Sequence, residues 1–204
     1  MPTNEPIGQG RMERKKEETK KKIIAVALQL FKQQGFEATT MEQIAREVDI
    51  AKGTLYNYFP VKEAIIDEHI KRTFRVKNAE RMLRLQELPD TRSRMTVIFH
   101  ELMEGVLANK EFFEKYIVYR MRNMVSFKQD DSEKSGFYLV AQEIIHMGQK
   151  GGEIRDDVPT HVLVDLCEFA FVEVVKQCYL EPEGLSVQSS IEQCIDLFIQ
   201  GAKA

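Results

Sequence analysis

Residues 39–60 constrain the fold most, because they predict two short helices separated by a tight turn. Thr40 stands three residues before Gln43 and directly ahead of an apolar run, which is the spacing of a capping box at a helix start. The apolar side chains of the first helix recur at i, i+3, i+4 and i+7 and must be buried on one face: Met41, Ile44, Ala45 and Val48. Asp49 and Ile50 interrupt this pattern, and Pro60 ends the second helix.

The second helix has an inward and an outward side. Leu55 and Phe59 are four residues apart and share the inward side. The outward side lacks the Lys and Glu of an ordinary solvated helix and carries small, hydroxyl, phenol and amide residues: Gly53, Thr54, Tyr56 and Asn57. Small residues allow close approach, a phenol can donate to phosphate, and an asparagine can bind adenine in a major groove. This pattern favours a DNA-binding surface, and an ordinary helical hairpin is the alternative.

Several short motifs stand together between residues 19 and 72. They comprise the helical stretch 21–31, its exit at 34–40, the pair Ile44 and Ala45, and residues 53–56 followed by Tyr58, Phe59, Lys62 and Glu63. This segment resembles the DNA-binding headpiece of the tetracycline-repressor (TetR) family of bacterial transcription regulators. The resemblance implies a homodimer that binds a palindromic operator in double-stranded DNA, usually as a repressor. It also implies that a small-molecule effector bound to a second domain releases the operator.

The resemblance assigns DNA contacts to a set of headpiece residues: Thr40, Lys52, Gly53, Thr54, Tyr56, Asn57, Tyr58 and Lys62. It places Thr40 at a helix N-terminus, where unpaired N–H groups and the helix dipole favour a phosphate. Tyr58 and Lys62 would also contact phosphates, although Tyr58 has the alternative of packing with its hydroxyl in water. Ala51 and Val61 depart from the family pattern, which often has a capping hydroxyl or amide side chain there, so weaker helix caps are expected.

The charges of the chain are unevenly distributed. Residues 1–85 carry a net charge of +5 and the remainder carries −8, within a total of −3. A basic N-terminal part favours phosphate, and a solvated surface of mixed charge is the alternative. Residues 1–16 are polar and predict a flexible tail. The basic stretch 11–16 would either enter an adjacent minor groove or stay an untethered tail.

The predicted fold is all-α, with a three-helix helix-turn-helix headpiece followed by a helical ligand-binding and dimerisation domain. We expect the flexible tail over residues 1–16 and the TetR-type DNA-binding domain over 17–77, with the helix-turn-helix at about 40–59. The ligand-binding and dimerisation domain would cover 78–204. The sequence has no signal-peptide pattern and no run of 18 apolar residues, so we expect a cytoplasmic protein without a membrane partner.

Helical spacing of apolar residues continues through the second domain. It predicts a long connecting helix over 61–88 and further helices at about 95–107, 112–124 and 137–150. Gly151 and Gly152 would close the last of these as a C-cap. Two final helices are expected at about 160–179 and 191–202.

Aromatic and methionine side chains of the second domain predict an adaptable pocket for a largely apolar effector, and core packing is their alternative role. The candidate ligand-binding residues are Phe99, Met103, Phe113, Tyr116, Arg120, Met124, Phe137 and Phe169. Arg120 shares a helix face with apolar residues, where a charge needs a partner. It would bind an anionic group of the effector or pair with an acid such as Glu143.

The last two predicted helices are apolar on more than half of their circumference. One face of each would pack inside the subunit and another would contact a second subunit, giving a four-helix interface. The candidate dimer-interface residues are Val164, Phe171, Val175, Ile191, Ile195 and Phe198. A deeply buried hairpin in a monomer is the alternative.

The sequence contains no motif that is typical of an enzyme or of a metal site. It has no nucleophile elbow, phosphate-binding glycine loop or metal triad. The 3 cysteines have no short paired spacing and predict reduced thiols, so we expect no metal and no cofactor. We therefore predict a ligand-released, sequence-specific transcriptional repressor and not an enzyme. The alternatives are a helical adaptor that binds a protein partner, or a regulator that needs a co-repressor or activates transcription.

Overall fold

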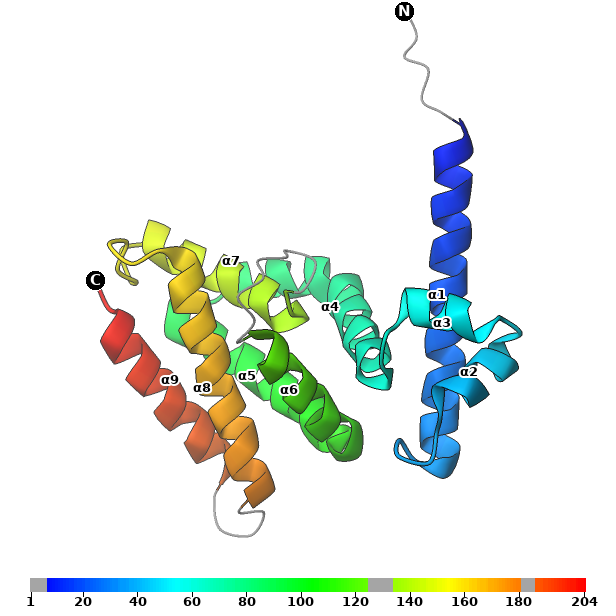
Figure 1. The fold of residues 1–204 in the computed structure, drawn as a ribbon. Helices are drawn as coiled ribbons and strands as arrows, with labels where there is room; N and C mark the ends of the chain where they lie inside the picture. The colour runs from blue at the N-terminus through cyan, green and yellow to red at the C-terminus, as the bar shows by residue number, and fades with distance from the viewer. Residues whose placement is uncertain (1–6, 125–133, 181–185) are drawn as a thin grey trace, which may run out of the picture. The chain divides into compact units, whose positions relative to one another are not determined.

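The computed structural model describes residues 7–124, 134–180 and 186–204, and these residues form helices joined by turns (Figure 1). One isolated β-bridge, between Ile154 and Lys203, is the exception within these ranges. The helices are α1 (Ile7–Gln34), α2 (Met41–Val48), α3 (Lys52–Tyr58), α4 (Lys62–Gln86), α5 (Thr91–Ala108), α6 (Lys110–Met124), α7 (Gly136–Lys150), α8 (Thr160–Leu180) and α9 (Val187–Ala202). The predicted all-α fold class is confirmed.

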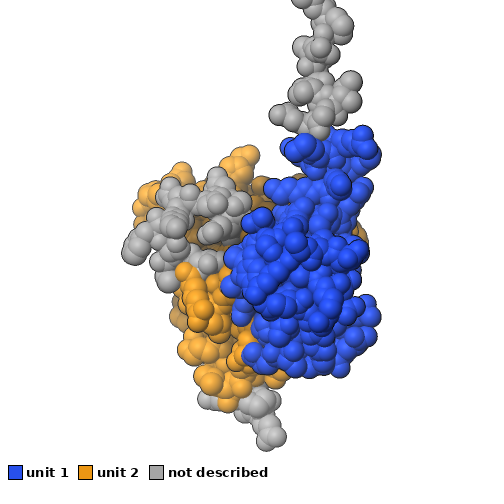
Figure 2. Space-filling model, turned by 45° about the vertical axis from the view of Figure 1, so that its right-hand side comes forward, with its two compact units in different colours: residues 1–69 blue, residues 70–204 orange. Residues whose placement is uncertain are grey.

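The chain divides into two compact units, residues 1–69 and residues 70–204 (Figure 2). The division falls within α4, before the domain boundary that we predicted after residue 77. Unit 1 contains α1, α2 and α3 with the start of α4. Unit 2 contains the rest of α4 and α5 to α9.

The start of α1 differs from the unstructured tail that we predicted for residues 1–16. The helix already begins at Ile7, and the side chains described from Gly10 to Glu18 are exposed. Arg14 and Glu18 form an ion pair at 3.7 Å, and the Thr19 hydroxyl donates to the Lys15 carbonyl at 2.9 Å. Lys, Glu, Arg and Met are strong helix formers, so local propensity outweighs the polarity that we interpreted as disorder.

A tight turn joins α2 to α3 in unit 1. Asp49 ends α2 in the left-handed region, with φ 61°, and its N–H donates to the carbonyls of Ala45 and Arg46. Asp is one of the few residues other than glycine that adopt this conformation readily. The ammonium of Lys22 in α1 donates to the last carbonyl of α2, at Val48, over 2.7 Å. The turn and the end of α2 are therefore fixed without a glycine.

The core of unit 1 is formed by apolar side chains from each of its helices. The interior residues are Ile23, Ile24, Ala27, Leu30, Phe31, Phe36, Met41, Ile44, Ala45, Val48, Leu55, Phe59, Ile65 and Ile66. They include the whole apolar face predicted for α2 and both inward residues predicted for α3. This burial fixes the rotation of α2 and α3, and so determines which side chains of α3 face outward.

The core of unit 2 lies between α5, α7, α8 and α9. Phe99, Phe137 and Phe171 come from three different helices, and their ring centroids lie 5.2 to 5.8 Å apart. The helices α8 and α9 run antiparallel and side by side (Figure 1). The helix bounds differ from the predicted ranges by a few residues, and Gly151 caps α7 while Gly152 takes a φ of 70°. The predicted close of this helix at the glycine pair is therefore confirmed.

Candidate nucleic-acid interface

The N-terminus of α2 has the cap that the sequence predicts, although the capping box is incomplete. The Thr40 hydroxyl accepts from the Gln43 N–H at 3.1 Å. The Gln43 side chain does not complete the box, because it exchanges two hydrogen bonds of 2.7 and 3.1 Å with the Gln34 amide of α1. Two bonds to a neighbouring helix replace the single bond expected within α2, and they hold α2 against the end of α1.

The helix α3 presents most of its side chains to solvent. Leu55 is fully buried and Phe59 is nearly so, while the residues between and before them are exposed or half-buried: Lys52, Gly53, Thr54, Tyr56, Asn57 and Tyr58. A Cβ atom added at Gly53 would meet nothing within 4 Å, so packing inside the protein does not require a glycine there. Ala51 supplies no side-chain cap to α3, as the sequence predicts.

Lys52 is engaged on this surface by two neighbours. Its ammonium forms an ion pair with the Glu42 carboxylate of α2 and lies 5.7 Å from the ring centroid of Tyr56. The hydrogen bond between the charged groups lowers the pKa of Glu42 and raises the pKa of Lys52. Glu42 was not among the predicted site residues, because sequence spacing does not reveal which residue of α2 faces the start of α3.

Lys62 occupies a different position from the phosphate contact that we predicted. Its ammonium donates to the carbonyls of Phe36 and Thr39 at 2.6 and 2.7 Å and lies 4.4 Å from the Phe36 ring centroid. A longer bond of 3.5 Å reaches the carbonyl of Glu37. Lys62 therefore holds the loop between α1 and α2, and its three donors are directed to that loop.

We expect Lys62→Ala to lower the free energy of unfolding by about 2 kcal/mol, because hydrogen bonds to a charged group are worth roughly 1.5–3 kcal/mol. Lys21→Ala removes the same charge from an exposed position of α1 and serves as the control. Urea unfolding of both variants measures the difference. Equal stability of the two variants would contradict a structural role for Lys62.

The predicted ligand-binding residues are only partly brought together. Phe99, Met103 and Phe137 lie in the core of unit 2, and Phe113 packs against it. Tyr116 and Arg120 are buried on α6, and the centroid of the Tyr116 ring lies 5.2 Å from that of Phe113.

The prediction is wrong for Phe169, which is 41% exposed on the outer side of α8. The side chain of Met124 lies outside the described residues. Arg120 is buried whereas Glu143 is exposed on α7.

The predicted dimer interface requires a correction. Val164, Phe171, Val175, Ile191 and Ile195 are at most 4% exposed within a single chain, and Phe198 packs against the same core. These residues therefore stabilise the core of the single chain. Because α8 is apolar around most of its circumference, its spacing could not distinguish the inner from the outer face. The exposed apolar residues of the pair are Val162, Leu166, Phe169 and Leu180 of α8 and Leu197 of α9.

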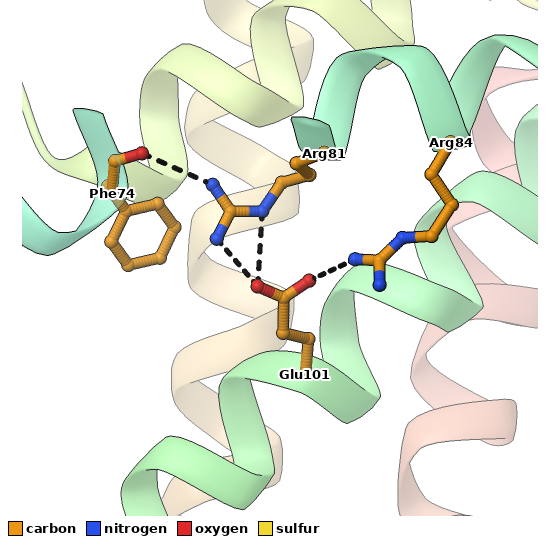
Figure 3. Close-up of polar contacts among 4 residues, drawn as sticks. All are labelled: Phe74, Arg81, Arg84 and Glu101. Carbon is orange, nitrogen blue, oxygen red and sulfur yellow. Dashed lines mark hydrogen bonds and ion pairs between the residues drawn. The ribbon is translucent and has the colours of Figure 1, made fainter. Parts of the chain in front are cut away.

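An ion-pair network around the buried Arg81 in unit 2 was also missed by the sequence analysis (Figure 3). Arg81 of α4 is 5% exposed and binds Glu101 of α5 at 2.6 Å, while Arg84 binds the second oxygen of Glu101 at the same distance. The Arg81 guanidinium lies 4.8 Å from the ring centroid of Phe74. A Cβ added at Gly136 would come within 2.4 Å of that ring, so α7 approaches α4 closely there. Arg81 stands four residues before the buried Leu85, and residues at this spacing share one face of a helix. This spacing was the signal in the sequence that could have indicated the burial of Arg81.

A second buried polar contact connects α7 with α8. Ser135 caps α7 by accepting from the Tyr138 N–H at 2.8 Å, and its hydroxyl donates to the Glu168 carboxylate at 2.5 Å. Both Ser135 and Glu168 are buried. Glu168 and burial together raise the pKa of the Cys167 thiol, with burial as the larger cause. This thiol is therefore protonated and unreactive at neutral pH.

The described residues provide neither a metal site nor a membrane-spanning helix. No group of three His, Cys, Asp or Glu side chains among them is placed to hold a metal ion. No helix in the described part of the chain combines the length and the apolar character needed to span a membrane.

The two short helices, the tight turn and the exposed face of α3 define a helix-turn-helix protein. Residues 23–68 match the family model of bacterial regulatory proteins of the tetR family. The N-terminal part of the chain therefore carries a DNA-binding domain of the TetR family.

Two curated relatives illustrate the extent of this similarity. The uncharacterized HTH-type transcriptional regulator YuxN of Bacillus subtilis (strain 168) is 35% identical over 100 residues, which are 47% of this chain and 33% of YuxN. IcaR of Staphylococcus aureus (strain Newman), the negative transcriptional regulator of the biofilm operon icaADBC, is 40% identical over 55 residues, 27% of this chain and 30% of IcaR. The matches thus span about a third or less of the length of these relatives.

Solved structures share the fold over most of the chain. The TetR-family repressor FadR of Thermus thermophilus, solved in complex with lauroyl-CoA, has a TM-score of 0.71 at 20% identity and covers 89% of this chain and 94% of its own. A TetR-family transcription regulator from Shewanella sp. PV-4 has a TM-score of 0.59 at 23% identity, covering 91% of this chain and 98% of its own. The similarity at these identities concerns the fold.

Proposed function

We propose that this protein is a transcriptional regulator that reads an operator in double-stranded DNA with the exposed face of α3. The observation that carries this proposal is the composition of that face. Gly53, Thr54, Tyr56 and Asn57 are exposed on a helix whose rotation is fixed by buried Leu55. They offer a close approach, hydroxyl donors and an amide to base edges and phosphates. Thr40 and Lys52 would contribute at the N-termini of α2 and α3, and Tyr58 at the edge.

A homodimer is part of the proposal. A single recognition helix reads few bases, whereas a two-fold pair reads two half-sites about one DNA turn apart or a multiple of it. The exposed apolar residues Val162, Leu166 and Phe169 follow one side of α8 at spacings of four and three, and α9 adds Leu197. Exposed apolar side chains that gather on one surface are typical of an interface. We assign the subunit interface to this surface, which we call the α8–α9 outer face.

Release of DNA by a small molecule is the third part of the proposal. A largely apolar effector would bind in unit 2 beside Phe113, Tyr116 and Arg120, where aromatic rings and a buried cation lie on one helix. A bound effector would shift the population between two arrangements of the DNA-binding units, which requires only a few kcal/mol of coupling. The protein would act in the cytoplasm as a repressor and not as an enzyme. If the effector is instead a co-repressor, it would bind at the same place in unit 2 and favour the arrangement of the DNA-binding units that binds the operator.

The test is selection of random duplex DNA by the wild type and by Tyr56→Ala at one salt concentration. Tyr56 is 40% exposed, so its truncation removes a contact group without opening the core. We expect the wild type to enrich a palindrome and the variant to lose that enrichment, with a Kd for the palindrome at least about tenfold weaker. If neither protein enriches a sequence, and if the binding of both proteins to duplex DNA does not depend on salt, the adaptor alternative is favoured.

A further inference from the structure

One acidic residue lies among the groups proposed to face DNA. Glu42 occupies the first turn of α2 and Lys52 the first position of α3, and their charged groups are paired across the turn. Both side chains remain more than half exposed, at 53% and 60%. Lys52 also lies over Tyr56, so the three side chains form a continuous row on the surface. We call it the Glu42–Lys52–Tyr56 row.

The contribution of this ion pair to folding stability is too small to explain why the pair is present. Exposed pairs contribute little to the stability of a protein, because solvent screens them and ordering the side chains costs entropy. The helix dipole favours Glu42 at the start of α2 but disfavours Lys52 at the start of α3. The ion pair therefore engages Lys52, which would otherwise be available at the N-terminus of α3 to bind a phosphate.

The pair changes the balance between operator and other DNA. When a phosphate draws Lys52 away, the Glu42 carboxylate is left without its cation beside a polyanion, and this repulsion opposes binding. A non-specific complex is held almost wholly by phosphate contacts, so it must draw Lys52 away from Glu42 and bears this cost in full. Base-edge contacts of α3 hold the operator complex even when Lys52 stays paired with Glu42, so the pair weakens non-specific binding by a larger factor than operator binding.

We propose that Glu42 is a specificity-determining residue that suppresses binding to non-operator DNA by competing with phosphate for Lys52. This proposal rests on the proposed function as a DNA-binding regulator. Glu42→Gln keeps the size of the side chain and removes its charge, which leaves Lys52 available to phosphate. One additional phosphate contact steepens the log–log salt dependence by about 0.9 and, at 0.1 M salt, tightens non-specific binding on the order of fivefold to tenfold.

The experiment measures the Kd of wild type and Glu42→Gln for the selected palindrome and for a scrambled duplex, across a range of salt concentrations. Glu47→Gln removes the same charge from an exposed position of the same helix and is the control. Both substitutions are repeated in a Lys52→Ala background, in which the ammonium group for which Glu42 and phosphate compete is absent. We expect Glu42→Gln to tighten scrambled-duplex binding more than palindrome binding, Glu47→Gln to have a smaller effect, and the Glu42 effect to disappear without Lys52.

Three results would overturn the inference while leaving the proposed function intact, provided that the wild type still prefers its palindrome. They are an unchanged salt slope for Glu42→Gln, equal effects of Glu42→Gln and Glu47→Gln, and a Glu42 effect that persists without Lys52. The last two would mean that only the overall charge matters. Failure of the wild type to bind any duplex would instead overturn the proposed function, and this inference with it.

Discussion

Replacement of Glu101 by glutamine is expected to lower the free energy of unfolding by about 2–3 kcal/mol. Arg81 is 5% exposed and would keep a buried charge without its carboxylate, and breaking a buried pair costs roughly 3–5 kcal/mol. The expected value is smaller because Glu101 retains some contact with solvent. Urea unfolding followed by circular dichroism measures the loss.

Arg84→Ala is the matched control for this substitution. Arg84 binds the same carboxylate but is 54% exposed, so its removal should cost less than about 1 kcal/mol. A loss as large as that of Glu101→Gln would show that burial of Arg81 is not the source of the stability.

The network also predicts how stability depends on pH. Partial burial would raise the pKa of Glu101, but hydrogen bonds and charge from Arg81 and Arg84 outweigh it and lower this pKa overall. The contribution of Glu101 is therefore fully present above its unfolded-state pKa and disappears as the pH falls through the lower folded-state pKa. The stability difference between wild type and Glu101→Gln should accordingly shrink in acid.

Leu166→Lys is expected to convert the proposed dimer into a monomer. The substitution places a charge at the centre of the α8–α9 outer face, where Leu166 is 53% exposed in the single chain. Loss of a central apolar contact costs at least about 2 kcal/mol, and burial of an unpaired charge adds to it, so subunit affinity should fall on the order of 100-fold or more. Sedimentation at micromolar concentration measures this change, and binding to the palindrome should weaken in parallel.

Leu107→Lys introduces the same charge at an exposed leucine of α5 outside this face, where it should leave the assembly unchanged. A Leu166→Lys protein that still sediments as a dimer would exclude the α8–α9 outer face as the subunit interface. A wild-type monomer would contradict the dimer itself.

Local patterns predicted the helix-turn-helix well. The spacing of the apolar residues of α2, the Thr40 cap and the inward pair Leu55 and Phe59 all depend on residues close together in the chain. Their side chains take the predicted orientation because each helix has one clearly apolar face. The exposed face of α3 followed from the same reasoning.

Contacts between distant residues could not be predicted in this way. The loop carbonyls that bind Lys62 lie more than twenty residues before it, and Glu101 follows Arg81 by twenty. Spacing along one helix gives no information on such partners. For α8 the difficulty was different, because apolar residues surround the helix and its period did not identify the face that packs inside. Phe169 was therefore assigned to a pocket although it faces solvent.

The missing side-chain cap at Ala51 has a consequence for the energetics of recognition. The helix α3 has only 7 residues, fewer than the roughly 12–15 that an isolated helix needs in water, so its order depends on burial of Leu55 and Phe59. Such a segment opens locally at a much smaller free energy than the whole unit. DNA binding must then supply the conformational entropy lost when α3 is held helical, which lowers affinity for every duplex alike. Position 51 is thus a place where affinity can be adjusted by pre-organisation while the bases that are read stay the same.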